Sequence, residues 1–484
     1  MNKTDIAGTR VSTDHWIGGT RVPSSRHFDV LSPIDGSLLA SVAAGGPEEV
    51  EAAVSAARAA FPEWAALGAA GRLPILKRFA DGIRARAAEL AAVETADNGS
   101  LLMGNQMRMV PRAAQNIEFF AEHAMKLLDE KIDSPEVVNH VRYDPAGIAA
   151  LITPWNAPLM LTTWKVGPAL AAGNTIVIKP PEWAPLSCSL LAEIAAEAGL
   201  PAGVLNVVQG IGEEAGAALV AHEDIDRISF TGSTGTARLI GQSASQTLTP
   251  LASELGGKSP FVVFADADLD AAAQTVAMQY MNAGQVCLAG TRVLVQASIE
   301  EEFLEKVRTA VSAMTVGDPH DKTTRVGPLI TQEHFDRVDG FVQRAIEAGA
   351  EAVWGGGPHE RGGLFYAPTL LKNVRTDMEV VQREVFGPVL TWQTFNDDQE
   401  VIDEANATRY GLAATLFTRD EKRAWEIASR VVAGTVWVNC FFVRELGAPF
   451  GGSRESGIGR EGGTWSFDFY CDVKNVAIRK DSFA

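Results

Sequence analysis

The sequence predicts an α/β protein with a doubly wound parallel sheet, a second α/β domain and a small β-extension. From Gly147 onward, short apolar runs alternate with helical patterns, which is typical of βαβ units. A second alternating series begins near Phe261 and ends near Thr435. The length of 484 residues is more than one hydrophobic core usually organises, so two or three domains are expected.

Four strands are predicted in the first series, each followed by a helix. The strands span residues 147–154, 175–179, 204–209 and 227–230. The helices span residues 161–172, 186–198 and 213–221, and the last begins after Thr234. Parallel sheets of this kind bind ligands at the carboxyl ends of their strands. The motifs that follow these strands are therefore candidates for a binding site.

Further elements are predicted on both sides of this series. Helical patterns cover residues 46–60, 72–97 and 112–125, ahead of the first parallel strands. The second series contains predicted strands at 291–296, 389–394, 413–417 and 434–439, and a helix at 269–281. Strand-like residues 138–143 and 473–480 lie outside both series and are predicted to pair as the β-extension.

Composition and charge argue against several kinds of partner. The chain carries 42 basic and 60 acidic side chains, and its net charge of -18 disfavours nucleic acid. No apolar run reaches the roughly 18 residues of a membrane span, and the polar N-terminus lacks the apolar core of a signal peptide. We therefore expect a cytoplasmic protein that binds neither nucleic acid nor a membrane.

Cysteine usage indicates a reducing compartment. Cys188, Cys287, Cys440 and Cys471 form no CxxC pair and have no histidine nearby at ligand spacing. This pattern argues against a disulfide framework and against a zinc site. We therefore expect free thiols and no bound metal.

Three glycine-rich loops compete as the phosphate-binding turn of a dinucleotide site. The segment 457–462 matches GxGxxG, but no predicted strand precedes it and Glu461 would repel a pyrophosphate. The segment 210–216 follows a strand, but its third glycine is out of register. The segment 230–235 is favoured, because Gly232 and Ser233 follow a strand and open a helix. Its alternative is an ordinary strand-to-helix turn.

Polar side chains close two other strands. Lys179 ends the second predicted strand and Glu182 follows it, so the pair could bind ribose hydroxyls or form a solvated charge pair. Asn156 ends the first strand between Pro154 and Pro158, which restrict the local backbone. Its amide could donate to a developing oxyanion, although a turn asparagine is the commoner case.

Cys287 and Glu254 form the candidate reactive pair. The cysteine has small neighbours, Gly284, Ala289 and Gly290, which leave its backbone open to a substrate. A free cysteine is most often a small buried hydrophobe, and a lone glutamate is as readily structural. Together the two residues indicate a nucleophile and a general base, and hence covalent catalysis followed by hydrolysis. The other three cysteines lack such surroundings and are interpreted as structural.

From about His15 to Lys480, the chain resembles the NAD(P)-dependent aldehyde dehydrogenase superfamily. The resemblance lies in seven motifs in order: Ile152-Thr-Pro-Trp-Asn-Ala-Pro158, Ile178-Lys-Pro180, Phe230-Thr-Gly-Ser233, Glu254-Leu-Gly-Gly-Lys258, Gly284-Gln-Val-Cys287, Glu384-Val-Phe-Gly-Pro388 and Pro449-Phe-Gly-Gly452. It implies a Rossmann-like NAD-binding domain at 1–120 and 145–253 and a catalytic domain at 254–450. It also implies oligomerisation segments at 121–144 and 465–484, and a homodimer or homotetramer.

The resemblance also assigns roles to individual residues. It implies Cys287 as nucleophile, Glu254 as general base, Asn156 as oxyanion donor and Lys258 in proton relay. It implies that NAD is held by the following set: Ile152, Thr153, Pro154, Trp155, Lys179, Glu182, Gly232, Ser233, Leu255, Gly256, Glu384 and Phe386. Glu182 favours NAD over NADP, because its carboxylate would repel a 2′-phosphate.

The implied reaction is oxidation of a small-molecule aldehyde to a carboxylate through a cysteine thiohemiacetal and thioester. Residues 111–120 and 439–446 look like the branch that acts on muconic semialdehydes from aromatic ring cleavage. Those substrates carry a carboxylate, so Arg112 and Arg444 are candidate clamps and Phe450 a candidate contact; salt bridges are the alternative for the arginines.

Gly447 and Ala448 depart from that branch, which leaves an aromatic or betaine-type aldehyde open. A CoA-acylating enzyme and a non-catalytic protein are further alternatives. Glu254 argues against the first of these, because transfer to CoA needs no activated water. The intact set of Cys287, Glu254 and Asn156 argues against the second.

Overall fold

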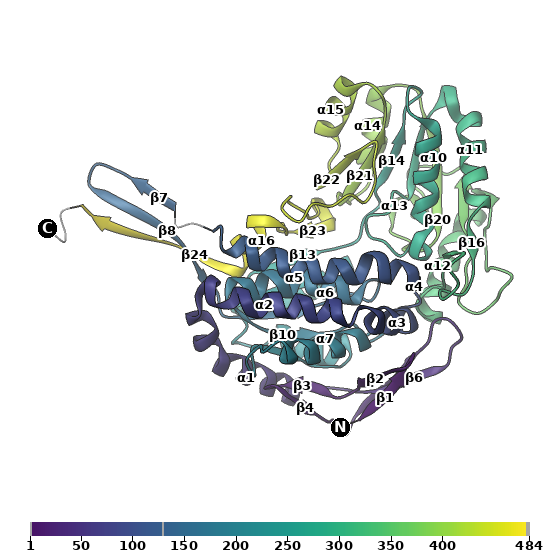
Figure 1. Ribbon diagram of the computed structural model, residues 1–484. Coiled ribbons are helices and arrows are strands. Elements are labelled where there is room, and N and C mark those ends of the chain that lie inside the picture. Colours follow the sequence, from purple (N-terminus) through teal and green to yellow (C-terminus); the bar gives the residue numbers. More distant parts are fainter. Residues whose placement is uncertain (1, 128–129, 481–484) are drawn as a thin grey trace.

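Two large mixed α/β units and a projecting three-stranded arm make up the protein (Figure 1). The computed structural model describes residues 2–127 and 130–480. Residue 1, residues 128–129 and residues 481–484, parts of the predicted segments 1–120, 121–144 and 465–484, lie outside the described residues. Within the described chain, no helix combines the length and apolar character needed to cross a membrane.

The first large sheet has eight strands in the order β23-β13-β12-β9-β10-β11-β3-β4. Its five central strands are parallel: β9 (Ile148–Ile152), β10 (Thr175–Lys179), β11 (Leu205–Val207), β12 (Arg227–Thr231) and β13 (Leu251–Glu254). Every residue of β9 and β10 is buried, as expected of strands covered by helices on both faces. The predicted doubly wound parallel sheet is confirmed.

Helices follow these strands as predicted, with some changes at their ends. They are α6 (Pro158–Ala172), α7 (Leu186–Glu197), η2 with α8 (Gly212–Gly216 and Ala217–Val220) and α9 (Thr234–Thr247). The segment 213–221 was expected to be one helix, but its first turn is a π-helix. Strand β9 also ends two residues before the predicted end, because Pro154 cannot donate to a strand ladder.

The second large sheet has seven strands in the order β18-β19-β20-β15-β14-β21-β22. The strands are β14 (Pro260–Val263), β15 (Arg292–Gln296), β18 (Glu351–Trp354), β19 (Thr369–Lys372), β20 (Val389–Phe395), β21 (Ala413–Phe417) and β22 (Thr435–Val438). All pairs except β18 with β19 are parallel. Its helices are α10 (Leu269–Ala277), α11 (Glu300–Ser312), α12 (Gln332–Glu347), α13 (Glu379–Gln382), α14 (Asp398–Asn406) and α15 (Glu421–Arg430). The predicted helix at 269–281 ends early, at Ala277, where a 3₁₀ segment, η3 (Met278–Gly284), begins.

The predicted β-extension is a three-stranded antiparallel arm that projects from the rest of the molecule (Figure 1). Strand β8 (Val137–Pro145) pairs with β7 (Glu130–Asp133) on one side and with β24 (Cys471–Arg479) on the other. The two strand-like segments thus pair with each other, as expected. Helix α16 (Gly463–Tyr470) leads into β24 and packs against α6.

The N-terminal region differs most from the sequence prediction. Helices α1 (Pro47–Ala66) and α5 (Val110–Ala124) are confirmed, but the predicted helix 72–97 is two helices, α2 (Gly68–Ala85) and α3 (Ala87–Asn98), which meet at Arg86. Six short strands before α1 were not predicted: β1 (Lys3–Ile6), β2 (Thr9–Ser12), β3 (His15–Ile17), β4 (Thr20–Val22), β5 (His27–Leu31) and β6 (Leu38–Ala43). Runs of three to six residues contain too few alternations to be recognised.

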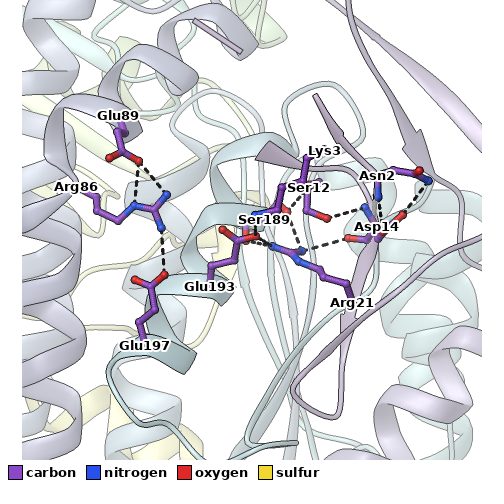
Figure 2. Close-up of polar contacts among 10 residues, drawn as sticks. All are labelled: Asn2, Lys3, Ser12, Asp14, Arg21, Arg86, Glu89, Ser189, Glu193 and Glu197. Carbon is purple, nitrogen blue, oxygen red and sulfur yellow. Dashed lines mark hydrogen bonds and ion pairs between the residues drawn. The ribbon is translucent and has the colours of Figure 1, made fainter. Parts of the chain in front are cut away.

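Partly buried polar contacts attach this N-terminal region to helix α7 (Figure 2). The Arg21 guanidinium donates to the Ser189 carbonyl oxygen and to the Glu193 carboxylate on α7, both at 2.9 Å. Asp14 accepts from the Asn2 backbone at 3.0 Å. Strand β3 also pairs antiparallel with β11, so the N-terminal segment completes one edge of the eight-stranded sheet.

The segment 457–462 that matched GxGxxG is an edge strand and turn. Gly457 and Ile458 form β23, which pairs antiparallel with Ser253 and Glu254 of β13. No parallel strand leads into it, as its poor context indicated. The segment 230–235 instead joins β12 directly to α9, in the strand-turn-helix arrangement that a phosphate-binding loop requires.

Candidate active site

A cavity of about 420 Å³ is lined by residues from both large α/β units. It brings together thirteen of the residues selected from the sequence: Pro154, Trp155, Asn156, Gly232, Ser233, Glu254, Leu255, Gly256, Cys287, Glu384, Phe386, Arg444 and Phe450. Six others are not among its lining residues: Arg112, Ile152, Thr153, Lys179, Glu182 and Lys258. Cys287, Glu254 and Asn156 therefore share one cavity, whereas the fourth predicted catalytic residue, Lys258, is not among its lining residues.

Asn156 lies in the loop between β9 and α6, and its amide is fixed by the segment that carries Cys287. Its Nδ2 donates to the Gln285 carbonyl oxygen at 2.9 Å. In return, Asn282 Nδ2 donates to the Asn156 carbonyl oxygen at 3.1 Å. An amide nitrogen carries two hydrogens, and this contact uses one of them. The oxyanion role of Asn156 stays a prediction.

The backbone before Cys287 is strained. Asn282 and Ala283 both have φ of 53° and Gly284 has φ of 68°. Left-handed conformations are uncommon for residues other than glycine and persist where the surroundings impose them. A Cβ added at Gly284 would collide with the Gly387 carbonyl oxygen. The loop therefore presents Cys287 from a backbone that is pressed against residues 384–387.

The Cys287 thiol is half-buried in the cavity, and it resists ionisation. Burial raises the pKa of the thiol to about 12, the nearby Glu384 carboxylate adds to the rise, and Arg444 opposes it. Burial therefore disfavours the thiolate of Cys287 in the free protein.

Glu254 ends β13 and is buried with one carboxylate oxygen unpaired. Its Oε2 has no hydrogen-bond partner among the described residues. Burial raises the pKa of Glu254 well above its ordinary value, and the charge of Glu461 raises it further, while Lys165 and Arg444 oppose this rise. A carboxylate with a raised pKa is a stronger base, which suits activation of a water molecule.

A second buried carboxylate, which the sequence reasoning did not assign, lies beside Glu254. Glu461 lines the cavity and accepts from Lys165 Nζ at 2.9 Å and from the Trp164 indole N–H. Lys165 Nζ also donates to Ser229 Oγ at 2.9 Å. In the sequence, Glu461 served only as an argument against a phosphate loop. The signal for its role is Lys165, because a buried lysine in the middle of a helix needs a carboxylate partner.

The carboxyl ends of β10 and β12 offer the groups that a dinucleotide needs. Lys179 Nζ lies 2.5 Å from Glu182 Oε2. The backbone of Gly212 lies next to both side chains. Ser233 is the N-cap of the 14-residue helix α9, and its Oγ accepts from the Thr236 N–H at 3.1 Å. The start of α9 therefore presents backbone N–H groups and the positive end of the helix dipole toward an anion. These residues fit NAD.

Glu384 and Phe386 form the wall of the cavity nearest the Cys287 loop. Glu384 Oε1 accepts from the Gly257 N–H at 3.0 Å. Burial raises the pKa of Glu384 to about 7. Phe386 has φ of 59° and meets the Trp155 ring edge-to-face at 5.3 Å between centroids. His334 and Arg337 of α12 also line this wall, although no sequence motif indicated them.

The other end of the cavity is aromatic and carries two arginines. The Arg444 guanidinium lies 3.6 Å from the Phe450 ring centroid and 4.7 Å from that of Trp164. Arg108, in the π-helix η1 (Asn105–Met109) that follows the short helix α4 (Leu102–Gly104), lines the same end and lies 5.6 Å from the Phe442 ring. The sequence reasoning selected Arg112 and missed Arg108, one helical turn earlier.

Arg112 and Lys258 are placed behind the cavity wall. Arg112 Nη2 donates to the Arg444 carbonyl oxygen at 3.1 Å, so Arg112 contacts the loop that carries Arg444. Lys258 is fully buried, and its Nζ has no hydrogen-bond partner among the described residues. Burial lowers the pKa of Lys258 to about 7. The clamp role of Arg112 and the relay role of Lys258 stay predictions.

The described residues contain no cluster of three or more His, Cys, Asp or Glu side chains able to hold a metal ion. All four cysteines are free. The ionisable side chains that line the cavity are one thiol, three carboxyls, one imidazole and three guanidiniums: Cys287, Glu254, Glu384, Glu461, His334, Arg108, Arg337 and Arg444.

Comparison with known proteins gives consistent results along the whole chain. Residues 21–476 match the model of the aldehyde dehydrogenase family. The chain is 40% identical to 2-aminomuconic semialdehyde dehydrogenase of Danio rerio, over 96% of this chain and 98% of the relative. It is also 40% identical to 2-hydroxymuconic semialdehyde dehydrogenase of Pseudomonas sp. (strain CF600), over 96% and 99%. Among solved structures, an indole-3-acetaldehyde dehydrogenase of P. syringae in complex with NAD⁺ and IAA superimposes with a TM-score of 0.95, at 39% identity over 97% of each chain.

Proposed function

Because this chain belongs to the aldehyde dehydrogenase family, we propose that it oxidises a carboxylate-bearing semialdehyde of the hydroxymuconic type with NAD. The observation that carries the choice of substrate is Arg444, a half-buried side chain that lines the cavity with Cys287. Its Nη2 atom is buried and has no hydrogen-bond partner among the described residues. A carboxylate on the substrate would provide the missing acceptor.

The residues of the cavity support each step of aldehyde oxidation. The Cys287 thiolate adds to the aldehyde carbon, and the oxyanion accepts from the Asn156 amide and the Cys287 backbone N–H. The chemistry that NAD would supply when bound is a hydride acceptor for this carbon. The resulting thioester is attacked by a water molecule whose proton passes to Glu254, and the acid leaves as Cys287 regains its thiol. The wall at Gly232, Ser233, Glu384 and Phe386 is the proposed cofactor side.

Arg444 is well placed to recognise a carboxylate. Trp164 and Phe450 pack against the guanidinium, which leaves its N–H edge for an in-plane acceptor. Burial lowers the pKa of Arg444 to about 10, so the group is still charged at neutral pH. A buried cation without a hydrogen-bonding anion is costly, and a bidentate carboxylate would remove that cost. Arg108 provides a second positive charge at the same end.

Replacing Arg444 by methionine is expected to lower kcat/KM for a semialdehyde acid by roughly 10- to 100-fold, the loss typical of a charged hydrogen bond. Methionine keeps the contact with the Phe450 ring, so a neutral aldehyde of similar size should be oxidised almost as before. Steady-state NADH formation with both substrates measures the difference. The surface variant Arg409→Met is the matched control. Equal losses for the acid and the neutral aldehyde would contradict the clamp.

The same pair of substrates separates the alternative functions. An aromatic aldehyde would be favoured by the rings of Trp164, Phe441 and Phe442 that line the cavity, and its preference would not depend on Arg444. A betaine-type aldehyde carries a cation that Arg444 would repel. A requirement for CoA would indicate the acylating reaction, which makes no use of Glu254.

We expect NAD to be preferred over NADP, because the Glu182 carboxylate suits a free 2′-hydroxyl and repels a 2′-phosphate. Replacing Glu182 by serine should raise kcat/KM for NADP and so narrow the preference for NAD over NADP. Lys179 is still present in this variant to bind the 2′-phosphate. Titrations with both cofactors at a saturating aldehyde concentration measure the ratio. Glu213→Ser, on the neighbouring exposed turn, should leave it unchanged. A wild-type enzyme that prefers NADP would overturn the role of Glu182.

We also propose that the arm assembles the chain into a homodimer or homotetramer. Ile132 on β7 and Val473 and Val476 on β24 are exposed, and β7 and β24 are the two outer strands of the arm. Exposed apolar side chains on edge strands suit burial against another copy. We also propose the domain limits given above: residues 1–120 and 145–253 for the NAD-binding domain and residues 254–450 for the catalytic domain. The proposed oligomerisation segments are residues 121–144 and 465–484. A cytoplasmic location, in keeping with the free thiols, is likewise proposed.

A further inference from the structure

One face of helix α12 is attached to three successive backbone carbonyls in the wall of the cavity. His334 and Arg337 are three residues apart and therefore lie on the same face of the helix. His334 Nε2 lies 2.8 Å from the Phe386 carbonyl oxygen. Arg337 Nη1 and Nη2 each donate at 2.7 Å, to the carbonyl oxygens of Val385 and Glu384. Every carbonyl from residue 384 to residue 386 thus receives a side-chain donor from α12.

These contacts hold a backbone that would not adopt its conformation unaided. Phe386 has φ of 59°, a left-handed conformation that costs a bulky residue free energy on the order of 1–3 kcal/mol. A carbonyl can only accept, so His334 Nε2 carries the hydrogen. The His334 ring is 5% exposed and packs edge-to-face against Trp155 at 5.3 Å. Thr331 caps the first turn of α12 and accepts from the His334 N–H at 3.2 Å, which fixes the start of the helix.

Residues 384–387 are closely packed on both sides. A Cβ added at Gly387 would lie 2.7 Å from Val338 Cγ2 of α12. On the opposite side, a Cβ added at Gly284 would collide with the Gly387 carbonyl oxygen. Residues 384–387 therefore lie between α12 and the loop that leads to Cys287. A change in the contact with α12 would move the Glu384 and Phe386 side chains relative to the thiol.

We infer that His334 and Arg337 are positioning residues that hold residues 384–386 in the conformation that receives the nicotinamide end of NAD beside Cys287. The inference rests on the proposed assignment of Glu384 and Phe386 to the cofactor. His334 acts through its neutral Nε2–H, since burial lowers the pKa of the ring to about 4. Neither residue takes part in the bond changes. Their effect is to set where the carboxylate of Glu384 and the ring of Phe386 stand.

The test compares NAD binding and the first turnover in paired variants. His334→Phe keeps a ring against Trp155 but removes the donor, whereas His334→Gln restores an N–H donor. Calorimetric titration without aldehyde should show that His334→Phe raises the Kd for NAD by about tenfold, the upper range for one lost hydrogen bond. His334→Gln should recover most of this loss. Arg337→Met should raise the Kd at least as much. In His334→Phe and Arg337→Met, first-turnover NADH formation should slow while the KM for aldehyde stays unchanged, and His334→Gln should stay near the wild type in both measurements.

Two further variants make the outcome decisive. Arg344→Met, on the same helix but paired with Glu379 at the surface, should bind NAD as the wild type does. Glu384→Gln tests the underlying assignment, because it must weaken NAD binding if Glu384 meets the cofactor. If Glu384→Gln weakens binding while Arg337→Met and His334→Phe do not, the positioning role is overturned. If His334→Gln is as impaired as His334→Phe, the N–H donor is not the active feature. Should His334→Phe fail to fold, Arg337→Met, whose side chain is exposed, decides the question.

Discussion

Replacing Cys287 by alanine is expected to abolish NADH formation with every aldehyde, by a factor on the order of 10⁴ or more. The reason is that no other thiol lines the cavity: Cys188 and Cys471 are buried elsewhere, and Cys440 is not among the lining residues. Without the covalent adduct, the aldehyde hydrogen is not expelled as hydride. The rise in NADH absorbance after mixing enzyme, NAD and aldehyde measures the loss.

The control for this variant is Cys471→Ala, which removes a buried thiol at the start of β24, away from the cavity. It should keep its turnover, apart from any small loss of stability seen as a lower Tm. Binding of NAD to Cys287→Ala, followed by calorimetry, should be close to that of the wild type, because the side chain is small. NADH formation by a folded Cys287→Ala protein that binds NAD would refute the assignment of Cys287 as the nucleophile.

Replacing Glu254 by glutamine is expected to separate the two halves of the reaction. The first NADH per active site should form as a burst, because thiol addition and hydride loss precede hydrolysis. The steady-state rate should then fall by roughly 10²- to 10⁴-fold, the contribution typical of a general base. Glutamine has nearly the same shape, so the β13 backbone and its pairing with β23 are preserved. Rapid mixing with stopped-flow absorbance distinguishes the burst from the slow phase.

Glu223→Gln is the matched control, because Glu223 is fully solvent-facing on a surface turn and lies far from the cavity lining. Acid quench and mass spectrometry of the Glu254→Gln enzyme should reveal an acyl group on Cys287. A Glu254→Gln enzyme that turns over at the wild-type steady-state rate would remove Glu254 from the hydrolytic step. Absence of both burst and turnover would instead place the defect before the thioester.

The parallel sheets were predictable because their strands are short, continuous apolar runs between helical patterns. Strands such as β10 and β15 are almost entirely buried, and burial on both faces leaves a continuous hydrophobic signal. The same signal is missing in β13, where Ser253 and Glu254 close a four-residue strand. The six short N-terminal strands are held by distant contacts, such as Arg21 with Glu193, that local patterns do not express.

Site residues that lie within a local sequence motif were predictable. Site residues whose role depends on contacts between distant segments of the chain were not. Cys287, Glu254 and Asn156 each lie among small residues or prolines that restrict the local backbone. Glu461 and Lys165 are 296 residues apart and become a pair only when α6 meets the turn after β23. His334 and Arg337 show no local signature, because their partners are backbone carbonyls of a distant segment. Arg108 was missed because the π-helix alters which side chains of this helix face the cavity.

Some parts of the cavity wall are held by several contacts and others lie in exposed segments, and this difference has an evolutionary consequence. Asn156 and the Cys287 segment are joined by reciprocal hydrogen bonds from side-chain amides to backbone carbonyls, and Glu254 lies on a paired strand. A substitution there therefore disturbs several partners at once. Arg108 and Phe442 instead come from an exposed π-helical turn and an irregular loop, segments that tolerate variation. A lineage could therefore exchange one aldehyde for another by drift in two surface segments, while inheriting the oxidation chemistry unchanged.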